Sequence, residues 1–394
     1  MLSAQVIESL PDLPTPVLTV YLNTSLPQPA GTTSAPLKPP YLLQLESQVK
    51  KIAGTVPAED REAFETQAKR VEAYLASHPL PYRGIIIFAG PEVWEVLPVQ
   101  TETQDEVGWG IPVLAQLFWL LDEHRPYGVV LAGRKGARFF LSRLGGMVEL
   151  EGIEFHPEES RRKEMGPVSR PGVRMSRGTN RDVFAHHRDA QFQLLHREIA
   201  ARIEHLRAAE RLDSIVLAGL SDVTRSIQKE LPEALRNDVV LVEEDLGFMS
   251  QAEIQERVVP LVASHERARE NKMVEELLEK SRGVAKGVDE TLAQLQQGRV
   301  RRIIAATGLG GDVRQCTRCG RVDREADATC SVCNGERQTV GLRAILPLLV
   351  RRQRVSMEVV SGEAAQKLRE TGGVCAWLRE FEPKEYSSSA STGR

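Results

Sequence analysis

Short apolar runs alternate along this chain with longer segments whose apolar residues recur at helical spacing. The runs 84–89 and 128–132 have no alternating polar positions, which predicts strands buried on both faces. One stripe of a predicted amphipathic helix consists of Phe184, Phe192, Leu195, Ile199, Ile203 and Leu206. Strands that alternate with helices in this way predict an α/β fold class.

The same pattern divides the 394 residues into three predicted α/β domains. The glycine pair at 145–146 marks a break in composition, and a charged helical segment over 251–280, bent at Pro260, is expected to connect the last two domains. A serine-rich tail has nothing to pack against and is predicted to be disordered. The predicted divisions are 1–145 (N-terminal domain), 146–272 (middle domain), 273–386 (third domain) and 387–394 (tail).

Composition and charge exclude several classes of protein. Hydrophobic residues make up 41% and charged residues 27%, as in ordinary globular chains. The formal net charge of −3 excludes a globally basic nucleic-acid binder but permits a local basic patch. No apolar run reaches the roughly 20 residues of a membrane helix, and no signal peptide is expected. We therefore expect a cytoplasmic protein.

Four of the five cysteines form two Cys-x-x-Cys pairs, which predict a zinc ribbon over 314–337. Disulfide frameworks are typical of short secreted domains, so this chain favours a reduced protein with a metal site. Four thiolates leave no open position on Zn²⁺, so the zinc would be structural; core cysteines or a redox pair are the alternatives. Gly320 and Gly335 follow the pairs, where such knuckles turn tightly, and the lone Cys375 is expected to be a buried thiol. The predicted ligands are Cys316, Cys319, Cys330 and Cys333.

A basic segment over 157–181 precedes the amphipathic helix, and between residues 161 and 181 its only acidic residue is Glu164. Prolines and glycines within it predict an irregular loop. Mobile guanidinium groups and free backbone donors suit contact with RNA phosphates, and a solvated surface loop is the alternative. Its basic residues are Arg161, Arg162, Lys163, Arg170, Arg174, Arg177 and Arg181.

No known catalytic motif accompanies the cysteine pairs and the basic segment. The chain has no Walker A sequence, no Gly-x-Ser-x-Gly and no His-Glu-x-x-His. The residues alone therefore indicate no enzyme site.

The order of these parts resembles the archaeo-eukaryotic class-1 peptide release factor and Pelota family, in its bacterial branch. The resemblance rests on the run 183–188 with the helix after it, on the strand 215–219 and on the segment 287–292 with Gly298. Archaeal members can carry a Cys-x-x-Cys insert at the corresponding place. The resemblance implies a third domain that is a sandwich like the kink-turn-binding ribosomal proteins, with the zinc ribbon inserted.

Two family motifs are missing from this sequence. The Gly-Gly-Gln triplet that acts in peptidyl-tRNA hydrolysis aligns with Arg177-Gly178-Thr179, where an arginine adds bulk and charge and threonine replaces glutamine. The stop-codon-reading Asn-Ile-Lys-Ser has no counterpart, because the proline-rich segment 27–40 stands in its place. The resemblance thus implies a ribosomal A-site body without hydrolysis or codon reading.

We therefore expect a ribosome-binding A-site factor that acts in hibernation or stress, as a monomer, and that a translational GTPase delivers. Its RNA contacts near the peptidyl-transferase centre would include Gly178 and Thr179 beside the seven basic residues. One alternative is a peptidyl-tRNA hydrolase acting in ribosome rescue or termination, with Gly178 and Thr179 in place of the catalytic pair. Another is a zinc-stabilised RNA-binding protein off the ribosome.

Overall fold

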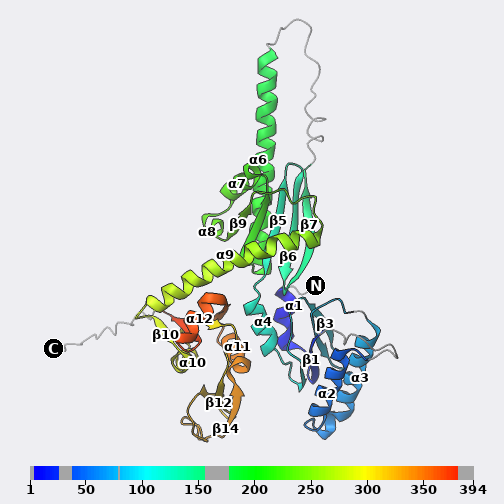
Figure 1. Cartoon of the computed structure of the whole chain (residues 1–394), viewed down its shortest axis with the longest axis vertical. Helices are drawn as coiled ribbons and strands as arrows, with labels where there is room; N and C mark the ends of the chain where they lie inside the picture. The colour runs from blue at the N-terminus through cyan, green and yellow to red at the C-terminus, as the bar shows by residue number, and fades with distance from the viewer. Residues whose placement is uncertain (1–3, 26–37, 79, 156–176, 380–394) are drawn as a thin grey trace, which may run out of the picture. The chain divides into compact units, whose positions relative to one another are not determined.

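The computed structural model describes residues 4–25, 38–78, 80–155 and 177–379, and between 177 and 189 it describes the backbone alone (Figure 1). The chain forms two compact units. Unit 1 comprises Met1–Gln116 and His124–His265, and unit 2 comprises Leu117–Glu123 and Glu266–Arg394. Both units contain helices and sheets, so the predicted mixed α/β class is confirmed. Among the described residues, no helix is long and apolar enough to cross a bilayer.

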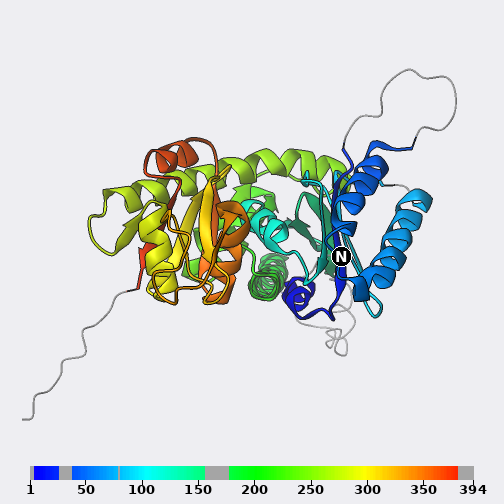
Figure 2. The same cartoon turned by 90° about the horizontal axis from the view of Figure 1, so that it is seen from below.

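The first part of unit 1 is an antiparallel sheet of four strands in the order β3-β2-β1-β4. The helices α2 (Pro40–Ala53) and α3 (Arg61–Ser77) cover one face, where Leu45, Phe64 and Val71 are buried (Figure 2). The strands are β1 (Val17–Asn23), β2 (Gly84–Ala89), β3 (Trp94–Val99) and β4 (Glu106–Gly110). The short elements are α1 (Ala4–Ser9), η1 (Leu10–Asp12) and η2 (Ala58–Asp60).

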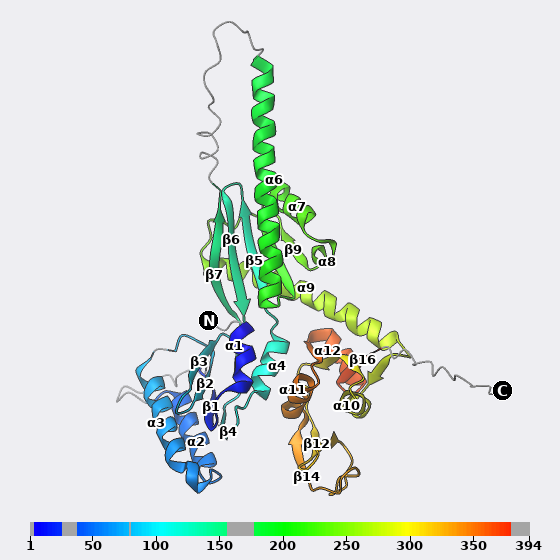
Figure 3. The same cartoon turned by 180° about the vertical axis from the view of Figure 1, so that it is seen from behind.

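The second part of unit 1 is a five-stranded sheet in the order β7-β6-β5-β8-β9 (Figure 3). Its strands are β5 (Tyr127–Gly133), β6 (Gly136–Arg143), β7 (Gly146–Glu154), β8 (Ser214–Gly219) and β9 (Val239–Val242). One face packs against α6 (Arg177–Glu210) and α7 (Ser221–Glu230), and the other against the first half of α9 (Gln251–Glu279). The small helix α8 (Glu233–Arg236) precedes β9. The predicted boundary at residue 145 falls between β6 and β7 of this single sheet. The division into three domains stays a prediction.

The amphipathic stripe of the long helix is confirmed where side chains are described, because Leu195, Ile199 and Ile203 are buried against the sheet. The side chain of Phe184 lies outside the described residues. Since α6 begins at Arg177, the prediction of an irregular loop through residue 181 is wrong at its end. The prolines lie upstream of this point, and Gly178 alone does not stop the helix.

Unit 2 is built on a four-stranded sheet in the order β10-β16-β11-β15. The helices α10 (Val288–Gln296) and α11 (Leu342–Arg352) pack on one face, together with Trp119 of α4 (Ala115–Glu123). On the other face, α12 (Gly362–Glu370) and the end of α9 surround the fully buried Cys375, as predicted for this thiol. The strands are β10 (Val284–Lys286), β11 (Val300–Ala306), β15 (Ser356–Val360) and β16 (Val374–Leu378).

Candidate metal centre

The four clustered cysteines lie on an antiparallel ribbon of three strands in the order β13-β12-β14. The strands are β12 (Asp312–Cys316), β13 (Val322–Asp323) and β14 (Arg337–Gly341). The pairing of β12 with β14 runs from Asp312 opposite Gly341 to Cys316 opposite Arg337. The ribbon therefore spans 312–341 and extends beyond the predicted 314–337, because the strands continue pairing outside the cysteine loops.

Each Cys-x-x-Cys pair sits in a tight backbone turn. In the first turn the N–H of Gly320 donates to the carbonyl of Cys316 over 3.0 Å, and Gly320 has a φ of 73°. In the second turn the N–H of Asn334 donates to the carbonyl of Cys330 over 2.9 Å, and Asn334 takes the positive φ of 54°. Gly335 has a different role, since a Cβ there would lie 2.8 Å from the Cβ of Arg318 and 3.1 Å from the Sγ of Cys316. The predicted tight turn is thus confirmed at Gly320, while Gly335 makes room for the Arg318 side chain and for sulfur.

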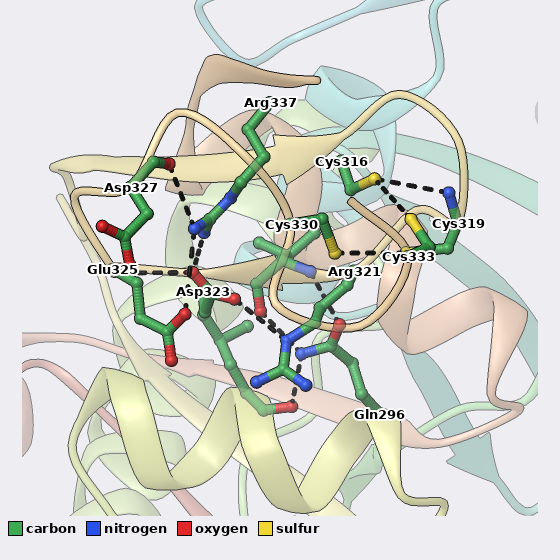
Figure 4. Close-up of polar contacts among 12 residues, drawn as sticks. Gln296, Cys316, Cys319, Arg321, Asp323, Glu325, Asp327, Cys330, Cys333 and Arg337 are labelled. Atoms are coloured by element: carbon green, nitrogen blue, oxygen red, sulfur yellow. Dashed lines mark hydrogen bonds and ion pairs between the residues drawn. The ribbon is translucent and has the colours of Figure 1, made fainter. Parts of the chain in front are cut away.

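The sulfur atoms have the spacing that one metal ion requires (Figure 4). All four Sγ atoms lie within 4.8 Å of one another. Cys316 and Cys333 have their Sγ atoms 3.4 Å apart, and the Sγ atoms of Cys319 and Cys330 are 3.6 Å apart. Four sulfurs each about 2.3 Å from a central ion stand roughly 3.8 Å apart in a tetrahedron. The arrangement can therefore hold one metal ion with four sulfur ligands.

The charge state of the sulfurs also depends on their crowding. The backbone N–H groups of Cys319 and Arg318 hold the pKa of Cys316 at about 6, against the effect of burial. At Cys333 the N–H of Gly335 lowers the pKa, but the neighbouring sulfurs and burial outweigh it and raise the pKa to about 12. Adjacent thiolates repel one another, so all four can ionise together only around a shared cation.

A buried arginine stabilises the loop between the two cysteine pairs. The side chain of Arg337 is 1% exposed and forms an ion pair with Asp323 (Figure 4). It also lies 3.8 Å from the carboxylate of Glu325 and donates to the carbonyl of Asp327 over 3.3 Å. Asp323 accepts a further bond of 3.0 Å from Arg321. These contacts close the loop 323–337 on the ribbon, and sequence reasoning missed them because the partners are separated along the chain.

A single glutamine joins the ribbon to helix α10. The N–H of Val322 donates to the Oε1 of Gln296, and the Nε2 of Gln296 donates to the carbonyl of Val322, both over 2.7 Å. Val322 is fully buried in the core of unit 2. Gln296 therefore pairs with both backbone groups of a β13 residue. No local sequence signal distinguishes it from the exposed Gln297.

More than half of the predicted RNA-contacting residues lie outside the described part of the chain. Arg161, Arg162, Lys163, Arg170 and Arg174 lie outside the described residues. Arg177, Gly178, Thr179 and Arg181 are described in their backbone only, as the first residues of α6. Their contact with RNA stays a prediction.

Solved structures similar to this chain include archaeal and yeast proteins. An archaeal translation termination factor, aRF1, is 15% identical, with 96% of this chain and 97% of that chain covered and a TM-score of 0.24. Pelota from Archaeoglobus fulgidus is 16% identical over 75% of this chain and 80% of its own, with a TM-score of 0.28. Dom34 from S. cerevisiae, a translation termination-like factor, is 9% identical over 67% and 66%, with a TM-score of 0.37. No curated protein matches the sequence.

A family model matches the middle part of the chain. The model for bacterial archaeo-eukaryotic release factor family 10 matches residues 112–261. These residues include every strand of the five-stranded sheet and the helices α6 and α7. This part of the chain is therefore similar to the bacterial archaeo-eukaryotic release factors.

Proposed function

We propose that this protein is a ribosome-associated translation factor that occupies the A site of idle ribosomes without hydrolysing peptidyl-tRNA. Its role would be ribosome hibernation or stress protection, as in Balon, the hibernation factor that the sequence resembles. The family match over residues 112–261 supports the ribosomal part of the proposal. Contact with RNA would come from the basic segment 157–181.

The start of α6 is the observation that carries the non-hydrolytic part. Arg177, Gly178 and Thr179, which align with the family's catalytic triplet, are the first three residues of a helix. The arginines at 177 and 181 would favour contact with phosphate oxygens. An arginine and a threonine at these positions supply neither a flexible Gly-Gly backbone nor the glutamine amide.

Co-sedimentation with 70S ribosomes tests the binding. We expect the pure protein to sediment with ribosomes at low salt and to dissociate as salt rises, because phosphate contacts release counterions. Arg177→Gln combined with Arg181→Gln should weaken this binding, whereas Arg202→Gln further along α6 should not. Recovery of the wild-type protein wholly in the ribosome-free fraction would overturn the proposal.

Stalled ribosomes with labelled peptidyl-tRNA distinguish this factor from a hydrolase. We expect no peptide release above background. Release that Gly178→Ala abolishes would instead establish the rescue or termination hydrolase.

The proposal includes structural zinc at the four cysteines and a third domain of the kink-turn-binding ribosomal protein type. The sulfur spacing and the absence of nitrogen or oxygen ligands in the cluster favour zinc. A translational GTPase as the delivering partner, a cytoplasmic location and a monomeric state follow from the family resemblance. Metal analysis of the purified chain tests the zinc directly, with about one equivalent expected.

A further inference from the structure

Arginines in or next to all four strands of the main sheet of unit 2 lie at one edge of that sheet. Strands β11 and β15 pair in parallel, with Arg302 opposite Ser356. The N-terminal ends of both strands therefore lie at the same edge of the sheet. On the antiparallel β16, the N–H of Arg379 donates to the carbonyl of Arg299 over 2.8 Å. The N–H of Leu378 next to it donates to the carbonyl of Gly283, just before β10, over 2.9 Å. We call this set the arginine edge: Arg282, Arg299, Arg301, Arg354 and Arg379.

The arginine edge is exposed to solvent. All five arginines are exposed, and so is Arg352 in the last turn of α11. No Asp or Glu occurs in the four described segments that form this edge, which are 281–284, 297–302, 351–356 and 377–379. The opposite edge differs, because Asp289 and Glu290 open α10 there and Glu363 opens α12. Positive charge is therefore concentrated at one edge of the sheet.

The composition of the edge fits a polyanion better than a protein surface. Protein interfaces have an apolar or aromatic centre, but none of the large exposed apolar side chains of the described chain lies in these four segments. The cations of the edge are all arginines, whose planar forks bind phosphate oxygens in pairs. Adjacent strands are about 4.8 Å apart, so the edge extends over about 14 Å from β10 to β15, which is enough for several phosphates.

We propose that the arginine edge binds the phosphate backbone of RNA. This surface is separate from the basic segment 157–181, to which the proposed function assigns the RNA contacts. The inference therefore goes beyond the proposed function and does not depend on it.

Binding of the full chain to a fluorescently labelled RNA hairpin tests the inference. The variant is Arg282→Gln with Arg301→Gln and Arg354→Gln. The matched control removes three exposed cations elsewhere, with Arg61→Gln, Lys69→Gln and Arg267→Gln. Affinity is measured by fluorescence anisotropy over a series of KCl concentrations, and circular dichroism confirms that both variants are folded.

We expect the edge variant to bind at least about tenfold more weakly than wild type at low salt. The slope of log K against log salt should become shallower by about 2, since each phosphate contact contributes about 0.7 to 0.9. The control should keep wild-type affinity and slope. Unchanged binding by the folded edge variant, or an equal loss in the control, would overturn the inference. Wild-type binding to phosphatidylserine vesicles but not to the hairpin would overturn it as well.

The two proposals fail separately in this design. A wild-type chain that binds the hairpin through the arginine edge but leaves 70S ribosomes unbound would refute the proposed function alone. Co-sedimentation with ribosomes and an edge variant that binds the hairpin like wild type would refute this inference alone.

Discussion

Replacing Gln296 by alanine tests whether one side chain holds the metal-binding ribbon on helix α10. The change removes the bonds of 2.7 Å to the N–H and to the carbonyl of Val322, which is fully buried. Each buried backbone group left without a partner costs about 1–3 kcal/mol. Gln296 and Val322 also line a surface hollow of about 400 Å³, where water can reach part of the exposed polar groups. We therefore expect a loss near the lower end of the summed range, about 2 kcal/mol.

Hydrogen exchange of backbone amides measures this loss locally, which matters because a chain with two compact units does not unfold in one step. A loss of 2 kcal/mol makes exchange about 30-fold faster, and we expect this at Val322 and along β12–β14. Amides of the five-stranded sheet in unit 1 should not change. Gln297→Ala, at the exposed neighbouring position, is the control and should leave exchange as in wild type. Equal exchange at Val322 in the two variants would refute the role of Gln296.

Three further predictions concern the metal and pH. A strong chelator, or the substitution Cys330→Ser, should release the metal and unfold the ribbon, since structural zinc contributes on the order of 10 kcal/mol to such sites. A chromophoric zinc indicator measures the released metal, and hydrogen exchange along 312–341 measures the unfolding. A ribbon whose exchange is unchanged would contradict this prediction. Burial lowers the pKa of His196 below its ordinary 6.5. The neutral imidazole therefore contributes stability above pH 6.5, and this stability is lost as pH falls through the lowered pKa. His196→Gln should lose less stability in acid than wild type in thermal melting, and a pH profile equal to that of wild type would refute this. Burial raises the pKa of Glu270, so wild type is stabilised in acid and loses this stability as pH rises through the raised pKa. Glu270→Gln should remove this pH dependence and be more stable than wild type at pH 8. Denaturant melts of the two proteins check this.

Local sequence signals predicted the elements that depend on local physics. Asp289 and Glu290 lie in the first turn of α10 and Gly298 adopts a φ of 70° after its end, as expected from helix dipole and capping rules. The cysteine spacing predicted a cluster that the geometry can use for a metal. Pro40 is the first residue of α2, where a missing N–H costs nothing. The helical segment expected over 251–280 is present as α9, which continues through Pro260.

Long-range contacts could not be predicted from the sequence. The ion pair of Arg337 with Asp323 joins residues on two different strands of the ribbon. The bonds of Gln296 to Val322 depend on the ribbon docking against α10, which no local pattern describes. Strand β6 (Gly136–Arg143) went unrecognised, because its hydrogen bonds to β5 and β7 define it better than its own residues do.

The net charge of the chain conceals how its charges are distributed. Residues 281–379 contain 17 Lys and Arg against 10 Asp and Glu, which gives +7 in a chain whose net charge is −3. The remaining residues therefore carry a net charge of −10. Like-charge repulsion keeps a polyanion away from an acidic surface, so the basic part of unit 2 would offer RNA a favourable surface in addition to the basic segment 157–181. Because the arginine edge lies on or directly beside paired strands, its backbone is held in place before binding, and ordering it costs less entropy than ordering a free loop. A net charge near zero thus excludes only evenly basic proteins, and a ribosome-binding chain with separated charges remains compatible with it.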